Sequence, residues 1–219
     1  MAERTMNTLL HVLEAYTELY RADEFYAVGD SIRDILRIFK FRGYDSDKEI
    51  CQVFFDKSYH SLISLESYGH DIEASWLIDR ACQILDDKAY YAEMLPVIEQ
   101  LADGAYKNGM DMQNQAMNNE CENGTVNAKK VWWVQAEAVT GFYNAYQNQP
   151  DRTEYLQVSE NVWDYIQKYI IDQKTGEWIE DISPDNTVKS SQALAHPWKC
   201  PYHNGRMCIE MIRRLSSAS

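Results

Sequence analysis

The stretch SYGHDIEASWLIDRACQIL, residues 67–85, decides the fold. Ile72 and Trp76 lie one helical turn apart, and further apolar residues continue the same spacing to the end of the stretch. This pattern predicts a helix over roughly residues 71–87, beginning after Gly69.

Periodic apolar residues on both sides of this stretch predict further helices, separated by connectors rich in turn-forming residues. The predicted helices cover residues 5–22, 25–41, 71–87, 89–107, 130–147, 152–172 and 202–215. The predicted connectors are a strand over 50–55, a hairpin or long loop over 110–128, an extended piece around Trp178 and a loop over 183–200. Antiparallel helix pairs joined by short strands indicate an all-α fold, an α/α toroid with short β-hairpin connectors. The strand candidates are too few and too polar for a βαβ fold.

The length of the chain bounds how much of such a toroid it can form. Its 219 residues suffice for one domain with its own core, and we expect a single domain over 1–219. A closed toroid needs more helices than the roughly seven predicted here. The pattern therefore predicts either an open bundle or part of a barrel whose preceding half is missing.

Composition and charge narrow the class of partner. Hydrophobic residues make up 45% of the chain, which excludes a disordered protein. No apolar run reaches the ~18 residues of a membrane span, and the N-terminus lacks the layout of a signal peptide. A net charge of −13 disfavours nucleic acids and anionic membrane surfaces, so we expect a neutral small molecule as substrate. The five cysteines are odd in number and form no CxxC pair, which predicts reduced thiols and a cytoplasmic location.

Three of the five histidines lie in contexts that favour chemistry. His70 opens a predicted helix, and Glu73 lies on the same helical face, where a carboxylate can orient the imidazole or raise its pKa. His203 follows two prolines in HPWKCPYHNGR, residues 196–206, a stiff loop that suits the fixed placement of a side chain. His11 lies on the first predicted helix, with Asn7 one turn earlier. Because His11 faces an otherwise apolar stripe, a structural histidine of the core is an equal alternative.

Other sites have weaker support in the sequence. We interpret His60 and His196 as structural histidines. His70, Glu73 and two further histidines could supply metal ligands, but there is no HExxH motif, and we predict no metal. No GxSxG motif and no glycine-rich phosphate loop occurs, and we predict no cofactor. A carboxylate pair for glycoside hydrolysis remains open among the 34 acidic residues, although no spacing selects one.

The tryptophans are candidates for contact with a sugar. Trp132 and Trp133 are adjacent on a predicted helix, about 100° apart, so one ring can face the core while the other faces a cleft. Glu137 lies one turn after Trp133. The alternative is that both rings pack in the core. Trp198, in the stiff loop before His203, is the better candidate for a sugar platform.

Four segments carry a resemblance to a known family, in the order in which that family has them. They are MNTLLHVLEAYTELY (6–20), SYGHDIEASWLIDRA (67–81), WWVQAEAV (132–139) and PWKCPYHNGRMCIE (197–210). These segments resemble the cellobiose 2-epimerases, within the N-acylglucosamine 2-epimerase superfamily.

The resemblance implies an (α/α)6 barrel, of which this chain would supply about seven of twelve helices. It also implies that His70 and His203 form an acid/base pair and that His11 assists ring opening and polarises the C1 carbonyl. Residues implied to line the site are Asn7, Glu73, Trp133, Glu137 and Trp198. The implied reaction inverts C2 at the reducing end of a β-1,4-linked disaccharide (cellobiose to glucosyl-mannose, lactose to epilactose) without metal or cofactor. The implied partners are the sugar and the missing N-terminal half of the barrel.

Several alternatives remain open beside this reading. The substrate could be an N-acylglucosamine or free mannose, and the chain could be a non-catalytic, sugar-binding remnant. A glycoside hydrolase on the same barrel is a third class. Within the epimerase reading, one base removes the C2 proton of the open-chain aldehyde and a second group returns it on the opposite face. Glu73 would set the protonation of His70.

Overall fold

The computed structural model describes residues 2–188 and 193–217, which contain seven α-helices. These are α1 (Met6–Asp23), α2 (Tyr26–Ile38), α3 (Tyr68–Leu85), α4 (Lys88–Gly104), α5 (Trp132–Asn148), α6 (Thr153–Tyr165) and α7 (His203–Ser217). All seven match predicted helices to within a few residues, apart from a π-helical turn that extends each of α2, α4 and α6. The π-helical turns are Phe39–Gly43, Ala105–Gly109 and Ile166–Ile170.

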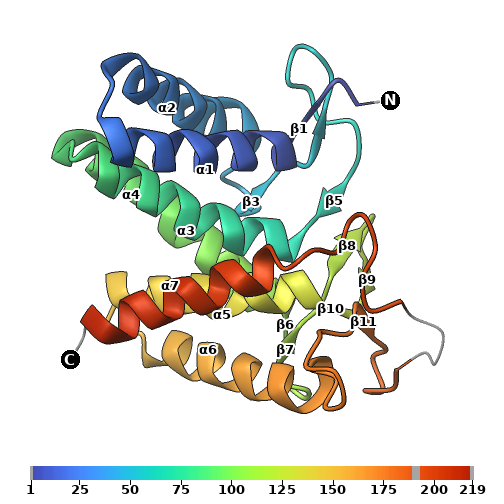
Figure 1. Cartoon of the computed structure of the whole chain (residues 1–219). Helices are drawn as coiled ribbons and strands as arrows, with labels where there is room; N and C mark the ends of the chain where they lie inside the picture. Colours follow the sequence, from blue (N-terminus) through green and yellow to red (C-terminus); the bar gives the residue numbers. More distant parts are fainter. Residues whose placement is uncertain (1, 189–192, 218–219) are drawn as a thin grey trace.

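The helices form two layers (Figure 1). The odd-numbered helices α1, α3, α5 and α7 lie side by side in sequence order and run in the same direction. Helices α2, α4 and α6 fold back against α1, α3 and α5, respectively, as antiparallel hairpins on the outside. The N-terminal ends of all four inner helices therefore lie at one end of the molecule.

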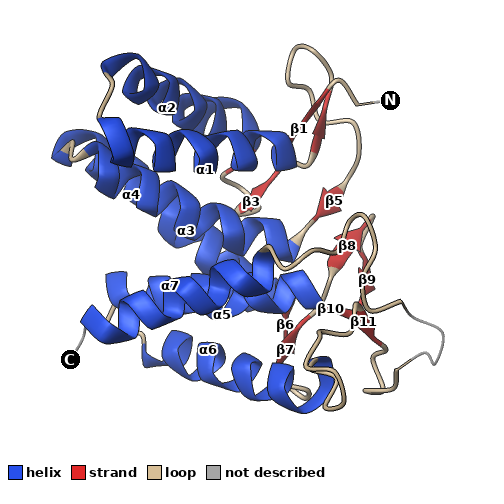
Figure 2. Ribbon diagram, viewed as in Figure 1, coloured by secondary structure: helices blue, strands red, loops and turns tan. Residues whose placement is uncertain are grey.

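Short antiparallel strands occupy that same end (Figure 2). They pair as β1 (Arg4–Thr5) with β4 (Phe54–Phe55), β2 (Tyr44–Asp45) with β3 (Ile50–Cys51), β6 (Met110–Asp111) with β7 (Ala116–Met117), and β10 (Lys130–Val131) with β11 (Asp181–Ile182). Strands β5 (Leu65–Glu66), β8 (Glu120–Glu122) and β9 (Thr125–Asn127) form a three-stranded sheet. The hairpin predicted over 110–128 is confirmed. The single strand predicted over 50–55 is wrong, because β3 and β4 pair with different partners.

Helix α3 joins the two halves of the core. It has 18 residues, and most of them are buried around its whole circumference. Tyr68 and Ile72 pack in the cluster formed by α5 and α6, whereas Trp76 and Leu77 pack in the cluster formed by α1, α2 and α4. This double burial explains why apolar residues occupy more than one face of its sequence.

Two further points concern the connectors and the helices as a whole. The predicted loop over 183–200 is irregular where it is described, and residues 189–192 lie outside the described residues. Within the described part of the chain, no helix combines the length and apolar character of a membrane span.

Candidate active site

The first turns of the inner helices bring four aromatic side chains together. His203 is the first residue of α7, Trp133 the second of α5 and His70 the third of α3. The Trp133 ring centroid lies 4.8 Å from that of His70 and 5.4 Å from that of His203. His11, from α1, lies 6.5 Å from His203 by the same measure. The three histidines predicted as catalytic are therefore neighbours, although they come from three helices.

His70 is held by two hydrogen bonds. Asn7 Nδ2 lies 3.3 Å from Nε2 of the imidazole, and Ser67 Oγ lies 2.7 Å from Nδ1. Because the Asn7 amide nitrogen can only donate, Nε2 accepts and Nδ1 carries the proton. Burial, followed by the nearby charges of His203 and His11, lowers the pKa of His70 to about 4. His70 is thus a neutral imidazole at neutral pH.

His203 is bound to a buried carboxylate. Its Nδ1 lies 2.7 Å from Glu137 Oε1, which can only accept, so Nδ1 donates and Nε2 is left without a proton in the neutral imidazole. Burial alone would raise the pKa of Glu137, but Arg206 and His203 together hold it well below its usual range. Glu137 is therefore an anion that orients His203.

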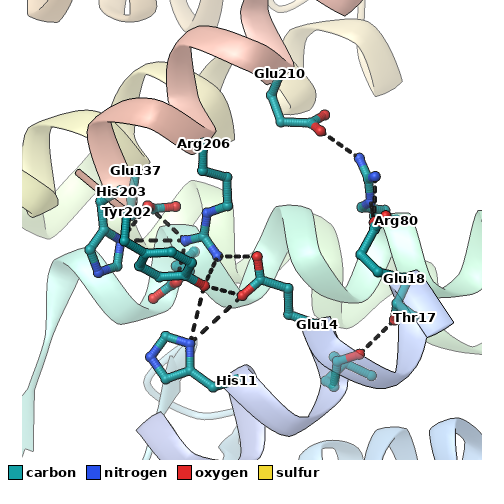
Figure 3. A network of polar contacts seen from close by, with 12 residues as sticks. His11, Glu14, Thr17, Glu18, Arg80, Glu137, Tyr202, His203, Arg206 and Glu210 are labelled. Atoms are coloured by element: carbon teal, nitrogen blue, oxygen red, sulfur yellow. Dashed lines mark hydrogen bonds and ion pairs between the residues drawn. The ribbon is translucent and has the colours of Figure 1, made fainter. Parts of the chain in front are cut away.

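Arg206, on the first turn of α7, is the centre of the polar network that lies between His203 and His11 (Figure 3). Its Nη2 donates to Glu137 Oε1 at 2.8 Å and to Glu73 Oε1 at 2.5 Å. Its Nη1 donates to Tyr202 Oη at 2.7 Å and lies 2.7 Å from Glu14 Oε1. These ion pairs raise the pKa of Arg206, which stays charged.

His11 lies at the edge of this network. Glu14 Oε2 is 3.7 Å from its Nδ1 and raises the pKa of His11. Tyr202 Oη lies 3.4 Å from the same nitrogen and also donates to Glu14. Burial works against ionisation of Glu14, yet its contacts with His11, Arg206 and Tyr202 lower its pKa to about 2. The protonated form of His11 is therefore favoured.

The structure gives Glu73 a different partner from the one hypothesised. The carboxylate of Glu73 is fully buried and accepts from Arg206, while His70 is bound by Ser67 and Asn7. The physical reason is that a buried carboxylate needs a cation, and the Arg206 guanidinium is the cation within reach. Burial and the neighbouring charge of Glu137 still raise the pKa of Glu73.

The adjacent residues Trp132 and Trp133 differ in burial, as the sequence predicted. Trp132 is buried in the core, and its ring centroid also lies 5.6 Å from that of His203, whereas Trp133 is half-buried and lies against both His70 and His203. Trp198 is 90% exposed, on the loop that precedes α7. The structure thus brings Asn7, Trp133 and Glu137 to the histidines, and leaves Trp198 in solvent.

Sequence reasoning missed the residues that hold the histidines. Arg206 and Tyr202 flank His203 within the motif quoted above, and Glu14 follows His11 by one helical turn. Ser67 precedes His70 by the same interval. The spacing of these residues from the histidines along the sequence is the signal by which they could have been found. His60 and His196, interpreted as structural, lie close to Asp56 and Glu180, respectively.

A carboxylate cluster raises the question of a metal. Among the described residues, Glu73, Glu137 and His203 offer ligand atoms within 4.8 Å of one another. Arg206 already binds both of these carboxylates, so a metal ion would have to compete with a bound guanidinium. The carboxylates of Glu73 and Glu137 are therefore arranged to bind the guanidinium of Arg206.

Helix hairpins arranged as an arc, with histidines at the N-terminal ends of the inner helices, define part of an (α/α)6 barrel of the sugar-epimerase type. Residues 2–204 match the family model N-acylglucosamine 2-epimerase (GlcNAc 2-epimerase), and the chain belongs to this family. The family resemblance and the fold class predicted from the sequence are therefore confirmed.

Individual relatives support the assignment. The chain is 44% identical to the cellobiose 2-epimerase of Ruminococcus albus over 97% of its own length and 54% of that relative. It is 40% identical to the cellobiose 2-epimerase of Dictyoglomus turgidum, with 98% and 54% covered.

Solved structures give the same result. The crystal structure of a sugar epimerase from a ruminal bacterium matches with a TM-score of 0.93 at 40% identity, over 97% of this chain and 54% of that one. The cellobiose 2-epimerase of Bacillus thermoamylovorans matches with a TM-score of 0.91 at 40% identity, over 98% and 54%. The chain thus spans about half the length of the relatives it matches.

Proposed function

We propose that this chain supplies the proton-transfer side of a cellobiose 2-epimerase, which inverts C2 of the reducing-end sugar of a β-1,4-linked disaccharide. The observation that carries the proposal is the contact of His70 and His203 with one indole, that of Trp133, at the ends of three neighbouring helices. We propose further that the chain forms one domain over 1–219 and works in the cytoplasm. Its remaining partner would be the other half of the barrel.

The proton is transferred between two imidazoles in this proposal. The sugar ring opens first, since the C2 proton is acidic only beside the C1 aldehyde. One neutral imidazole takes the C2 proton, and the electron pair of the C–H bond forms the enediolate with its charge on O1. The protonated partner, on the opposite face, returns a proton to C2. His70, neutral because it is buried, and His203, bound to Glu137, fit these two roles in both directions.

The charge on O1 needs stabilisation. His11, whose raised pKa favours the imidazolium, is the candidate donor to O1 and assists ring opening. The N-terminal ends of α3, α5 and α7 carry the positive ends of their dipoles to the same place. Asn7 holds His70, Glu137 holds His203, and Glu73 acts through Arg206. Trp133 would face the sugar ring, and Trp198 would cover it from the loop.

Exchange of the C2 hydrogen with solvent deuterium tests the proposal. Because the chain spans about half of its relatives, we expect little or no exchange with the chain alone. Co-expression with the N-terminal half of the Ruminococcus albus relative should restore exchange on cellobiose. His70→Gln or His203→Gln should then abolish it, and His60→Gln, an exposed histidine, is the matched control.

The outcomes separate the alternatives. Binding of cellobiose without exchange in the complemented protein would identify a sugar-binding remnant and refute the proposal. Release of glucose would identify a hydrolase. Faster exchange on N-acetylglucosamine or mannose than on cellobiose would move the chain to the other substrate classes of its family.

A further inference from the structure

The carboxylate that orients His203 accepts three hydrogen bonds: Trp76 Nε1 donates to its Oε2 at 3.0 Å, and two further donors share its Oε1. Glu137 Oε1 accepts from Nδ1 of His203 at 2.7 Å and from Nη2 of Arg206 at 2.8 Å. His203 and Arg206 donate to the same oxygen atom, so the hydrogen bond of each to the carboxylate is weaker than it would be alone. Glu137 is buried almost completely, and water cannot take the place of either donor.

The charge balance around this oxygen depends on Arg206. Glu14, Glu73 and Glu137 all lie against its guanidinium. Without that cation, Glu137 and His203 would be left as a buried pair with no guanidinium bound to the same oxygen. A buried ion pair of this kind holds its proton, whereas reversible transfer needs an imidazole that gives and takes one with similar ease.

We propose that Arg206 is a positioning residue that shares Glu137 with His203 and so keeps the His203 imidazole free to exchange its proton. The inference rests on the proposed function, because it assigns a purpose to proton exchange at His203. Arg206 would not touch the sugar. It would act through Glu137, and its fork of donors would hold the neighbouring carboxylates at the same time.

Ionisable groups lie near His203 on every inner helix, and the Arg206 variants change one of them. They are His11 and Glu14 from α1, His70 and Glu73 from α3, Glu137 from α5, and Tyr202 and Arg206 next to His203 itself. A change at Arg206 alone therefore reports on the guanidinium, whose Nη2 binds the shared oxygen and lies 3.4 Å from His203 Nδ1.

The experiment is a titration of His203 by nitrogen NMR in the chain as it stands, which requires no activity. Arg206→Met should raise the midpoint pH of that titration by about one unit or more, because one unit corresponds to the loss of one moderate charge interaction. Arg206→Lys keeps the charge without the fork and should raise the midpoint by about half as much. Arg37→Met, on the surface of α2, is the matched control and should leave the midpoint unchanged.

The outcomes decide the inference separately from the proposed function. An unchanged or lower midpoint in a folded Arg206→Met chain overturns the role of Arg206. If circular dichroism shows that this variant does not fold, the Arg206→Lys chain decides, and an unchanged midpoint there overturns the role as well. In the complemented enzyme, the pH profile of C2 exchange should move in the same direction as the titration. Absence of any exchange would count against the proposed function alone.

Discussion

At the scale of single residues, the site is defined by the different surroundings of its histidines. His70 is bound by uncharged partners and stays neutral, His11 lies beside Glu14, and His203 is bound to Glu137. The sequence predicted these three positions together with Asn7, Trp133 and Glu137, but not the contacts of Ser67, Glu14 and Arg206. Arg206 and Glu73 are 133 positions apart, and no local spacing predicts a contact over that distance.

The low pKa of His70 has a consequence for stability. The imidazole titrates at about 4 in the folded chain and near its ordinary value of 6.5 in the unfolded chain. Between these values the unfolded state binds the proton and the folded state does not, so stability should fall as the pH falls through this window. His70→Gln should make the fall shallower, by up to about 1.4 kcal/mol per pH unit.

Urea unfolding at a series of pH values measures this slope. His60→Gln removes an exposed histidine and serves as the control, which should keep the slope of the parent. A His70→Gln chain with the parental slope would contradict a neutral, buried His70.

At the scale of elements, the apolar pattern predicted the helices but did not predict how they end. Each of the seven helices was predicted because one or more of its faces is packed. The π-helical turns after α2, α4 and α6 were not predicted, because their residues continue the apolar spacing of the helix before them. The separate pairing of β3 and β4 depends on partners that lie elsewhere in the chain.

Helix α3 approaches α5 closely at Gly69. A Cβ atom at this position would lie 2.7 Å from two ring carbons of Trp133 and 2.8 Å from Val134 Cγ2. Gly69→Ala should therefore displace the Trp133 ring and lower the free energy of unfolding by about 1–3 kcal/mol, as overpacking does. Gly205→Ala is the matched control, since no atom lies within 4 Å of its added Cβ.

Chemical denaturation of both variants measures the difference, and tryptophan fluorescence reports the displaced ring. Equal stability of the two alanine variants would show that α3 and α5 can separate without cost, contrary to their packing.

At the scale of the whole molecule, the arc of helices leaves apolar side chains uncovered. On α7, Ile212 is 65% and Leu215 is 53% exposed. They border a groove of about 500 Å³ between α5, α6 and α7, lined also by Trp163 and Met211. Such a surface is unusual for a protein that works alone.

The groove should bind an apolar fluorescent dye in the isolated chain. Ile212→Glu should reduce dye fluorescence to about half or less, because it places a charge at the rim of this apolar groove. Val126→Glu is the matched control, since Val126 is 47% exposed on β9, away from the groove. Equal loss of fluorescence in the two variants would locate the dye elsewhere.

The position of Arg206 near the end of the chain bears on the order in which the molecule matures during synthesis. Glu73 and Glu137 leave the ribosome 133 and 69 positions before the guanidinium that neutralises them. Until then, two acids on the inner surfaces of α3 and α5 have no counter-ion, and those surfaces must stay hydrated or take up protons. This end of the helix arc can therefore exclude water only after α7 has been made.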